Sequence, residues 1–181
     1  MYKYDIAKKG SENMLALLNA SAKEGVAVTA ADVSWSAPKA DATVDGANTQ
    51  VTLSVVEGSA VVNNESPAIT RHYSRLDLSD VVTAIGATIA FQETLEAYDD
   101  DTKKLAKFVE ATGISLEAGD VTIATDADAA TVTVTMVETH LDLIGSAKMV
   151  FQKPAPVLPT LDESLPGEKL QGFDAPAASG E

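Results

Sequence analysis

Two stretches of the chain alternate between apolar and hydroxyl-bearing side chains. Residues 50–56 read Gln-Val-Thr-Leu-Ser-Val-Val, and residues 131–137 read Thr-Val-Thr-Val-Thr-Met-Val. A period of two puts alternate side chains on opposite faces of an extended chain, so both stretches are predicted to be strands with one buried face. Shorter β-prone stretches are expected at residues 26–33, 68–76, 121–123 and 141–151.

Three other stretches have the apolar spacing of helices. They are predicted at residues 11–23, 78–87 and 99–112. Gly25 and Gly113 are expected to end the first and the third, because glycine adopts the left-handed conformation that follows many helices. Asp77 is expected to cap the second helix through its carboxylate.

The two halves of the chain resemble each other in sequence. Residues 25–34 (GVAVTAADVS) align with residues 113–122 (GISLEAGDVT) at a constant offset, 113 − 25 = 88. Residues 51–57 align with residues 132–138 at an offset of 132 − 51 = 81. The loop between the two aligned segments is therefore shorter by 88 − 81 = 7 residues in the second half.

This internal repeat predicts the fold. Each copy follows a predicted helix and precedes an alternating strand, and Asp32 coincides with Asp120, where each is expected to organise a turn. We predict an α+β fold of duplicated helix–strand–strand units with a mainly antiparallel sheet, in which residues 12–56 superpose on residues 102–137. The alternative is that common α+β patterns recur by chance.

Three parts are expected along the chain. Residues 1–9 form an N-terminal arm, residues 10–152 form the duplicated body, and residues 153–181 form an extended, proline-rich C-terminal arm. Within the body, repeat one covers about 10–77 and repeat two about 98–152.

The C-terminal arm combines proline with large apolar side chains. Five of the seven prolines fall in residues 154–176, and proline disfavours both helix interiors and central strands. A pure linker would be polar, whereas this segment has apolar residues too few to make a core of their own. We expect it to dock on a neighbouring molecule; the alternative is that it wraps over its own body. The expected anchors are Leu161, Leu165, Leu170 and Phe173.

Composition and charge exclude several classes of function. The formal net charge of −14 repels phosphate and anionic lipid, so neither a nucleic acid nor a membrane is expected as a partner. The chain has no cysteine, which excludes disulfides and thiolate sites. No signal peptide and no membrane span are recognised, and a soluble protein made in a cytoplasm is expected.

Residues with catalytic or metal-binding chemistry are few. The only histidines, His72 and His140, fall in different halves and are each expected to be a partly exposed strand residue. The acidic pair Asp126 and Asp128 lacks the glycine and the closing glutamate of a calcium loop. Phosphate-binding, dinucleotide-binding and nucleophile motifs are absent. We therefore expect a protein that is not an enzyme, with no catalytic, metal-binding or cofactor-binding residue and no cofactor.

The two arginines of the chain lie close together. Arg71, Tyr73 and Arg75 would point to the same side of a strand, on an otherwise acidic molecule. Because arginine and tyrosine are enriched at interface hot spots, these three are interface candidates. Intramolecular pairing with acidic side chains is the alternative.

The same region carries a family resemblance. Residues 69–78 read Ile-Thr-Arg-His-Tyr-Ser-Arg-Leu-Asp-Leu. The element Tyr-x-Arg-Leu-Asp-Leu, after a helix–strand unit and a proline-containing loop, resembles uncharacterised virion structural proteins of very large (jumbo) tailed bacteriophages, over roughly residues 10–80. The resemblance implies a virion component in the head, neck or tail, made in the host cytoplasm. Its partners would be other virion structural proteins and copies of itself.

A binding module is the alternative function. Such a protein would recognise a small ligand or a carbohydrate through its loops. Sugar sites favour exposed aromatic rings, and aromatic residues make up only 5% of this chain, with Trp35 as its one tryptophan.

Overall fold

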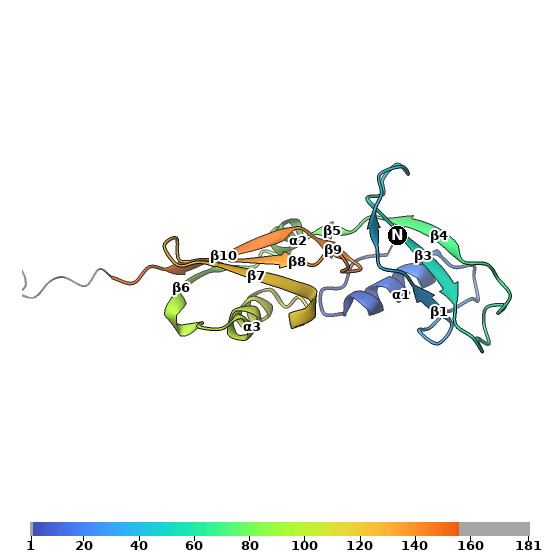
Figure 1. The fold of residues 1–181 in the computed structure, drawn as a ribbon, viewed down its shortest axis with the longest axis horizontal. Helices are drawn as coiled ribbons and strands as arrows, with labels where there is room; N and C mark the ends of the chain where they lie inside the picture. The colour runs from blue at the N-terminus through green and yellow to red at the C-terminus, as the bar shows by residue number, and fades with distance from the viewer. Residues whose placement is uncertain (1, 156–181) are drawn as a thin grey trace, which may run out of the picture.

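The computed structural model describes residues 2–155 and is an α+β fold with mostly antiparallel sheets, as predicted. Two units follow one another along the long axis of the molecule (Figure 1). Unit one is residues 10–73 and unit two is residues 78–152. Between them, β5 (Leu76–Asp77) pairs in parallel with β9 (Leu143–Ile144), and we call this strand pair the junction.

Unit one packs one helix on a four-stranded sheet. Helix α1 (Gly10–Ser21) precedes β1 (Val33–Trp35), β2 (Lys39–Ala40), β3 (Thr49–Val55) and β4 (Ile69–Tyr73). Strand β3 is central, with β1 and β2 along one side and β4 along the other. The alternation predicted for β3 buries Val51 and Leu53 against Met14 of α1, which forms a small core.

Unit two holds the larger core. Its sheet has the order β6-β10-β8-β7, with β6 parallel to β10 and the other pairs antiparallel. Helix α2 and helix α3 pack on one face, against buried side chains such as Val132, Val134 and Met149. The elements are α2 (Leu78–Ala84), β6 (Ala90–Thr94), α3 (Asp101–Thr112), β7 (Val121–Asp126), β8 (Thr131–Met136) and β10 (Ser146–Gln152). Two short 3-10 turns, Leu95–Ala97 and Ala118–Asp120, complete the unit.

The strand pairing of the two halves agrees with the repeat. Strand β1 pairs with β3 in the register Val33↔Val55, and β7 pairs with β8 in the register Val121↔Met136. These pairs are related by the sequence offsets, 121 − 33 = 88 and 136 − 55 = 81. The third strands, β4 and β10, also pair antiparallel with β3 and β8. Each half thus contains a helix and three antiparallel strands in the same order, and unit one has β2 in addition.

The two aspartates of the repeat make the same hydrogen bonds. The amide of Thr29 donates to Asp32 Oδ2 at 2.9 Å, and the amide of Glu117 donates to Asp120 Oδ2 at 2.8 Å. The carbonyl of Asp32 accepts the amide of Val56, and the carbonyl of Asp120 accepts the amide of Val137. Each of these amides directly follows the central strand of its unit. Both carboxylates therefore organise a turn, as predicted.

The turn at Asp32 leads to a prediction about pH. Hydrogen bonds from Thr29, and then from the Ser59 hydroxyl, hold the pKa of Asp32 below its usual value. A carboxylate with a lowered folded-state pKa stabilises the protein above its unfolded-state pKa, about 3.9, and this contribution is lost as the pH falls through the lowered value. We expect Asp32→Ala to destabilise the protein at neutral pH and to cost progressively less below about pH 4.

Urea denaturation of wild type and variant across this range measures the effect. The exposed Asp45 provides the control, since Asp45→Ala should change stability little at any pH. A gap between Asp32→Ala and wild type that is constant from neutral to acid pH would contradict the assignment.

Several details differ from the sequence predictions, and of the strand expected at residues 26–33 only Val33 lies in a strand, β1. Helix α1 ends at Ser21 and not near Lys23, because the Asn19 side chain binds both the amide and the carbonyl of Val28 and turns the chain back. Gly25 lies in the next turn with φ of +82°, while Gly113 does cap α3 with φ of +69°. Strand β6 was not predicted, because its apolar residues do not alternate over a sufficient length.

The N-terminal segment, residues 2–9, also differs from the expected arm. It lies on the body, where Tyr4 and Ile6 pack against the larger core. The amide of Ser115 donates to the carbonyl of Ile6 at 2.8 Å. The segment therefore connects the start of α1 to unit two. The C-terminal arm beyond residue 155 lies outside the described residues.

Candidate functional site

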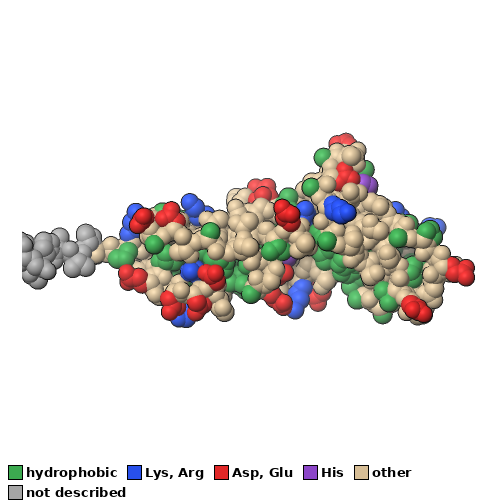
Figure 2. Space-filling model, in the orientation of Figure 1, with side chains coloured by type: hydrophobic (Ala, Val, Ile, Leu, Met, Phe, Trp, Pro, Cys, Tyr) green, Lys and Arg blue, Asp and Glu red, His purple; other side chains and the backbone are tan. Residues whose placement is uncertain are grey.

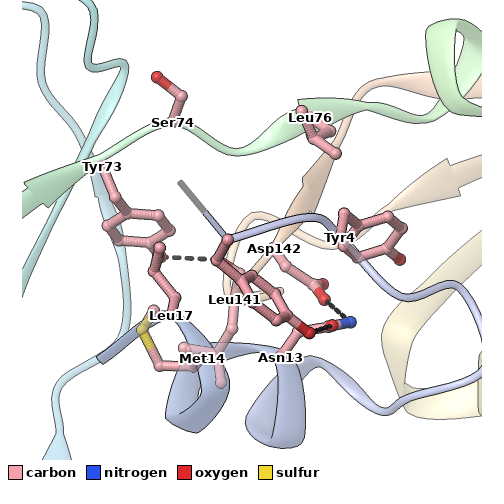
Figure 3. Close-up of a pocket in the computed structure, with 10 residues that line it drawn as sticks. Tyr4, Asn13, Met14, Leu17, Tyr73, Ser74, Leu76, Leu141 and Asp142 are labelled. Atoms are coloured by element: carbon pink, nitrogen blue, oxygen red, sulfur yellow. Dashed lines mark hydrogen bonds between the residues drawn. The ribbon is translucent and has the colours of Figure 1, made fainter. Parts of the chain in front are cut away.

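A groove of about 200 Å³ opens where unit one meets the junction (Figure 3). Its floor is apolar: Met14 and Leu17 come from α1, Leu76 from β5, and Leu141 from the loop before β9. Met14 and Leu17 share one face of α1 because residues three apart are neighbours on a helix. Such a floor suits an apolar side chain better than a polar ligand.

The rim of the groove is made by tyrosines. Three of the four tyrosines of the chain line it, Tyr2 and Tyr4 from the N-terminal segment and Tyr73 from the end of β4. The Tyr73 hydroxyl donates to the carbonyl of Leu141 at 2.6 Å, which ties β4 to the loop before β9. Burial raises the pKa of Tyr73 to about 12 and also raises the pKa of Tyr4. Both phenols are therefore neutral at physiological pH.

A buried asparagine fixes the shape of the groove. The amide nitrogen of Asn13 donates to Asp142 Oδ2 at 2.8 Å and to the carbonyl of Asp5 at 3.0 Å. Its carbonyl oxygen accepts the Tyr2 hydroxyl at 2.7 Å. One side chain at the start of α1 thus holds together the N-terminal segment and the loop before β9, so the groove has little freedom to collapse.

Behind the groove, a histidine lies between two carboxylates. His140 is 7% exposed and therefore buried, contrary to the expectation of a partly exposed residue. Its Nδ1 lies 2.9 Å from Asp142 Oδ1, and its Nε2 lies 3.9 Å from Asp120 Oδ1. A Cβ at Gly10 would lie 3.1 Å from the same Asp142 oxygen, so α1 begins at close contact with this pair. The amide of Leu143 donates to the same Nδ1 at 3.3 Å, and the cluster links the repeat turn at Asp120 to the groove wall.

The second histidine lies far from this cluster along the chain. His72 is on β4, with Nδ1 at 3.4 Å from Asp41 Oδ2. In the described part of the chain, no group of three or more histidine, cysteine, aspartate or glutamate side chains could hold a metal ion. Residues 2–155 also contain no helix of the length and apolar character required to cross a membrane.

The predicted cluster of Arg71, Tyr73 and Arg75 is separated by the structure. Strand β4 ends at Tyr73, and both Tyr73 and Arg75 donate to backbone carbonyls of residues 138–141 in unit two. Arg71 stays exposed, and its side chain donates to the adjacent carbonyl of Thr70. Leu161, Leu165, Leu170 and Phe173 lie outside the described residues.

Arg75 is a link inside the molecule. Its side chain is 8% exposed and donates from Nε to the Thr49 hydroxyl at 2.9 Å. One terminal nitrogen donates to the carbonyl of Glu138 at 2.7 Å and to that of His140 at 3.1 Å. Arg75 therefore bridges the two repeats. Its partners in unit two are backbone carbonyls, and not the acidic side chains that the sequence suggested as the alternative to an interface.

Strand β4 forms an edge of the sheet beside the groove. Within residues 2–155, β4 pairs along one side with β3 and has no strand on its other side. Four of its five residues are exposed, among them Ile69 at 41%. The edge runs directly into the groove, because Tyr73, Ser74 and Leu76 line it. Edge and groove together form one continuous surface, which we call the acceptor surface.

Several residues of the acceptor surface were missed by the sequence analysis. They are Tyr2, Tyr4, Asn13, Leu141 and Asp142. One signal existed: two tyrosines lie two residues apart at the start of a chain with few aromatic residues. No local pattern pointed to Asn13 or Asp142, because these two residues meet across 129 positions of sequence.

The chain matches the model of a known family. The model of a family described as "Family of unknown function (DUF7941)" matches residues 3–180. No curated protein and no solved structure matches the chain.

Proposed function

We propose that this chain, which belongs to the family of unknown function DUF7941, is a structural subunit that acts by protein–protein assembly, as a component of the virion of a large tailed bacteriophage. The acceptor surface is the observation that supports assembly. The resemblance of residues 69–78 to virion proteins is what supports the particle.

An unpaired strand edge is suited to bind another chain. Its free backbone N–H and C=O groups accept an added strand, and natural proteins usually shorten, cover or charge such edges. On β4 the edge carries the exposed apolar Ile69 and is continued by an apolar groove. Hydrogen bonds along the edge would give affinity, and the groove would select the side chain that enters it.

The charge of the molecule favours specific contacts. Acidic side chains are spread over both units on the face shown in Figure 2, with apolar patches between them. With a formal net charge of −14, copies of the chain repel one another unless they meet at a complementary surface. Assembly would then occur through a few specific contacts and not through non-specific association.

Self-association of the full chain tests this proposal. We expect sedimentation velocity to show oligomers that grow with concentration, and quantitative mass spectrometry of purified particles to find several copies per particle. Ile69→Lys should weaken the association, because a charged side chain blocks an edge. Val61→Lys is the matched control, since Val61 is 48% exposed and lies in a loop away from the strand.

Two results would overturn the proposal. One is a chain that stays monomeric at every concentration and is absent from particles. The other is saturable binding of a glycan by the monomer in isothermal titration, which would favour the small-ligand module.

A further inference from the structure

We infer that the end of β4, with Ser74 after it, accepts residues 160–165 of a second copy of this chain as an added parallel strand, with Leu161 beside Tyr73 and Leu165 at the groove. This inference rests on the proposed function and names the partner for the acceptor surface. It follows from comparing what covers the third strand in each repeat.

In unit two the third strand is covered. Strand β10 is equivalent to β4. Val51 pairs with Arg71 and its equivalent Val132 pairs with Met149, so Arg71 and Met149 are equivalent residues. The offset between β4 and β10 is therefore 149 − 71 = 78. Strand β6 pairs in parallel with the edge of β10. In the described residues, β4 has no such neighbour.

The burial of equivalent residues shows the difference. Ala147 is 5% exposed, whereas its equivalent Ile69 is 41% exposed. Met149 is fully buried, whereas its equivalent Arg71 is exposed. Unit one thus leaves open the positions that unit two covers with its own α2 and β6.

The chain carries a second segment that resembles β6. Residues 91–95 read Phe-Gln-Glu-Thr-Leu, and residues 161–165 read Leu-Asp-Glu-Ser-Leu, at an offset of 161 − 91 = 70. Glutamate and the final leucine are identical, and the other positions keep an apolar, a polar and a hydroxyl residue. Residues 160–165 are also free of proline, so every amide can donate to an edge.

Transfer of the β6 register fixes where this segment would lie. Val150 corresponds to His72 by the offset of 78, and Ala90 corresponds to Thr160 by the offset of 70. The pair Val150↔Ala90 in unit two therefore predicts the pair His72↔Thr160. Leu161 then lies beside Tyr73, as Phe91 lies beside Phe151 with ring centroids 5.1 Å apart.

The end of the segment reaches the groove. The register of β6 shifts between its two pairs with β10, and after that shift Gln152↔Thr94 becomes Ser74↔Ser164. Leu165 therefore follows Ser74 towards the apolar groove floor.

Charge on the two segments is complementary. The added strand would bring Asp162 and Glu163 to an edge that holds Arg71 and His72. In unit two, the equivalent glutamate, Glu93, pairs with Lys107 at 3.0 Å. In the described part of the chain, the Arg71 side chain binds the Thr70 carbonyl and makes no ion pair.

The length of the chain favours a second copy over the same molecule. Strands β10 and β4 extend in opposite directions from the junction (Figure 1). Eight residue steps separate Gln152 from Thr160 and span about 27 Å when extended. The path from Gln152 back along β10 to the junction, and from there along the chain to His72, is about 40 Å long at about 3.3 Å per residue. A copy's own segment is too short, so copies would join head to tail in a ring or an open chain.

Disulfide trapping between full-length chains tests the register. Because the chain has no cysteine, His72→Cys in one chain and Thr160→Cys in another supply the only thiols, and each variant oxidised alone shows whether identical chains also pair. Neighbouring parallel strands lie about 4.8 Å apart, within the Cα separation that a disulfide spans. We expect a covalent dimer on oxidation of the mixture. Thr160→Cys with Ser54→Cys, which is exposed on β3, is the matched control and should remain monomeric on a denaturing gel.

The outcomes separate this inference from the proposed function. A disulfide that forms only within one chain carrying both cysteines would assign the edge to the molecule's own segment and overturn the inference. No disulfide at all, with sedimentation still showing assembly, would overturn the inference and leave the proposed function standing. Absence of assembly altogether would overturn both.

A second variant pair tests the anchor. Leu165→Asp should weaken self-association about tenfold to a hundredfold, because burial of a leucine contributes to affinity in this range. Leu158→Asp makes the same change before the matched segment and should have less than a tenth of that effect. Equal effects of the two substitutions would show that general apolar contact, not this segment, drives association.

Discussion

Replacing Arg75 by methionine is expected to lower the free energy of unfolding by about 3–5 kcal/mol, because each hydrogen bond from a charged donor contributes about 1.5–3 kcal/mol. The side chain is 8% exposed and makes three such bonds. Methionine keeps an apolar stem of similar length but leaves the carbonyls of Glu138 and His140 without this donor. Those carbonyls belong to the repeat opposite Arg75, so the loss falls on the contact between the units.

The matched control is the other arginine of the chain. Arg71→Met should change stability by no more than about 0.5 kcal/mol, because its side chain is exposed. Urea denaturation can be followed by the fluorescence of Trp35, which lies in unit one, and by far-ultraviolet circular dichroism, which reports both units. We expect the two signals to coincide in wild type and to separate in Arg75→Met. Coincident curves and a small shift would contradict the bridging role.

Gly145→Ala is expected to lower the free energy of unfolding by about 2–4 kcal/mol. This cost combines the penalty for a left-handed backbone at a residue with a Cβ and the loss of a helix cap. Gly145 joins β9 to β10 with φ of +78°, and an added Cβ would overlap the carboxylate of Asp77. That carboxylate caps α2 by accepting the amide of Ser79 at 2.8 Å. The methyl group therefore displaces the cap or strains the junction.

Gly86→Ala separates the two causes. Gly86 has φ of +66°, and a Cβ there would meet no atom within 4 Å. Its cost should be the backbone penalty alone, about 1–2 kcal/mol. Chemical denaturation of both variants measures the difference. An equal loss of stability in the two variants would mean that the Asp77 side chain moves aside without cost. The contact between Gly145 and Asp77 would then not constrain the junction.

The two repeats carry the same strand pairing but end differently. Unit two adds α2 and β6 to its third strand and closes its core, whereas unit one leaves β4 open beside the groove. Arg75 and the Asn13 network hold the open half firmly to the closed one. A body that leaves β4 open beside the groove suits a subunit that must present that edge at a defined angle.

Patterns within a few residues were enough to locate most of the elements. Alternation marked β3 and β8, Asp77 and Gly113 marked the ends of helices, and a constant offset revealed the repeat with its strand order. These features could be predicted because a strand period, a cap and a turn each depend on neighbours in sequence. The charge and the absence of cysteine were equally readable from the chain.

The acceptor surface depended on contacts between distant residues. Asn13 meets Asp142, and Tyr73 meets Leu141 across 68 positions, so no window along the chain contains either pair. Arg75, predicted at an interface, bonds carbonyls more than 60 positions later in the chain, a contact that no local pattern could show. Strand β6 forms by pairing in parallel with β10, some 60 residues later, and its own side chains carry too weak an alternation to specify a strand.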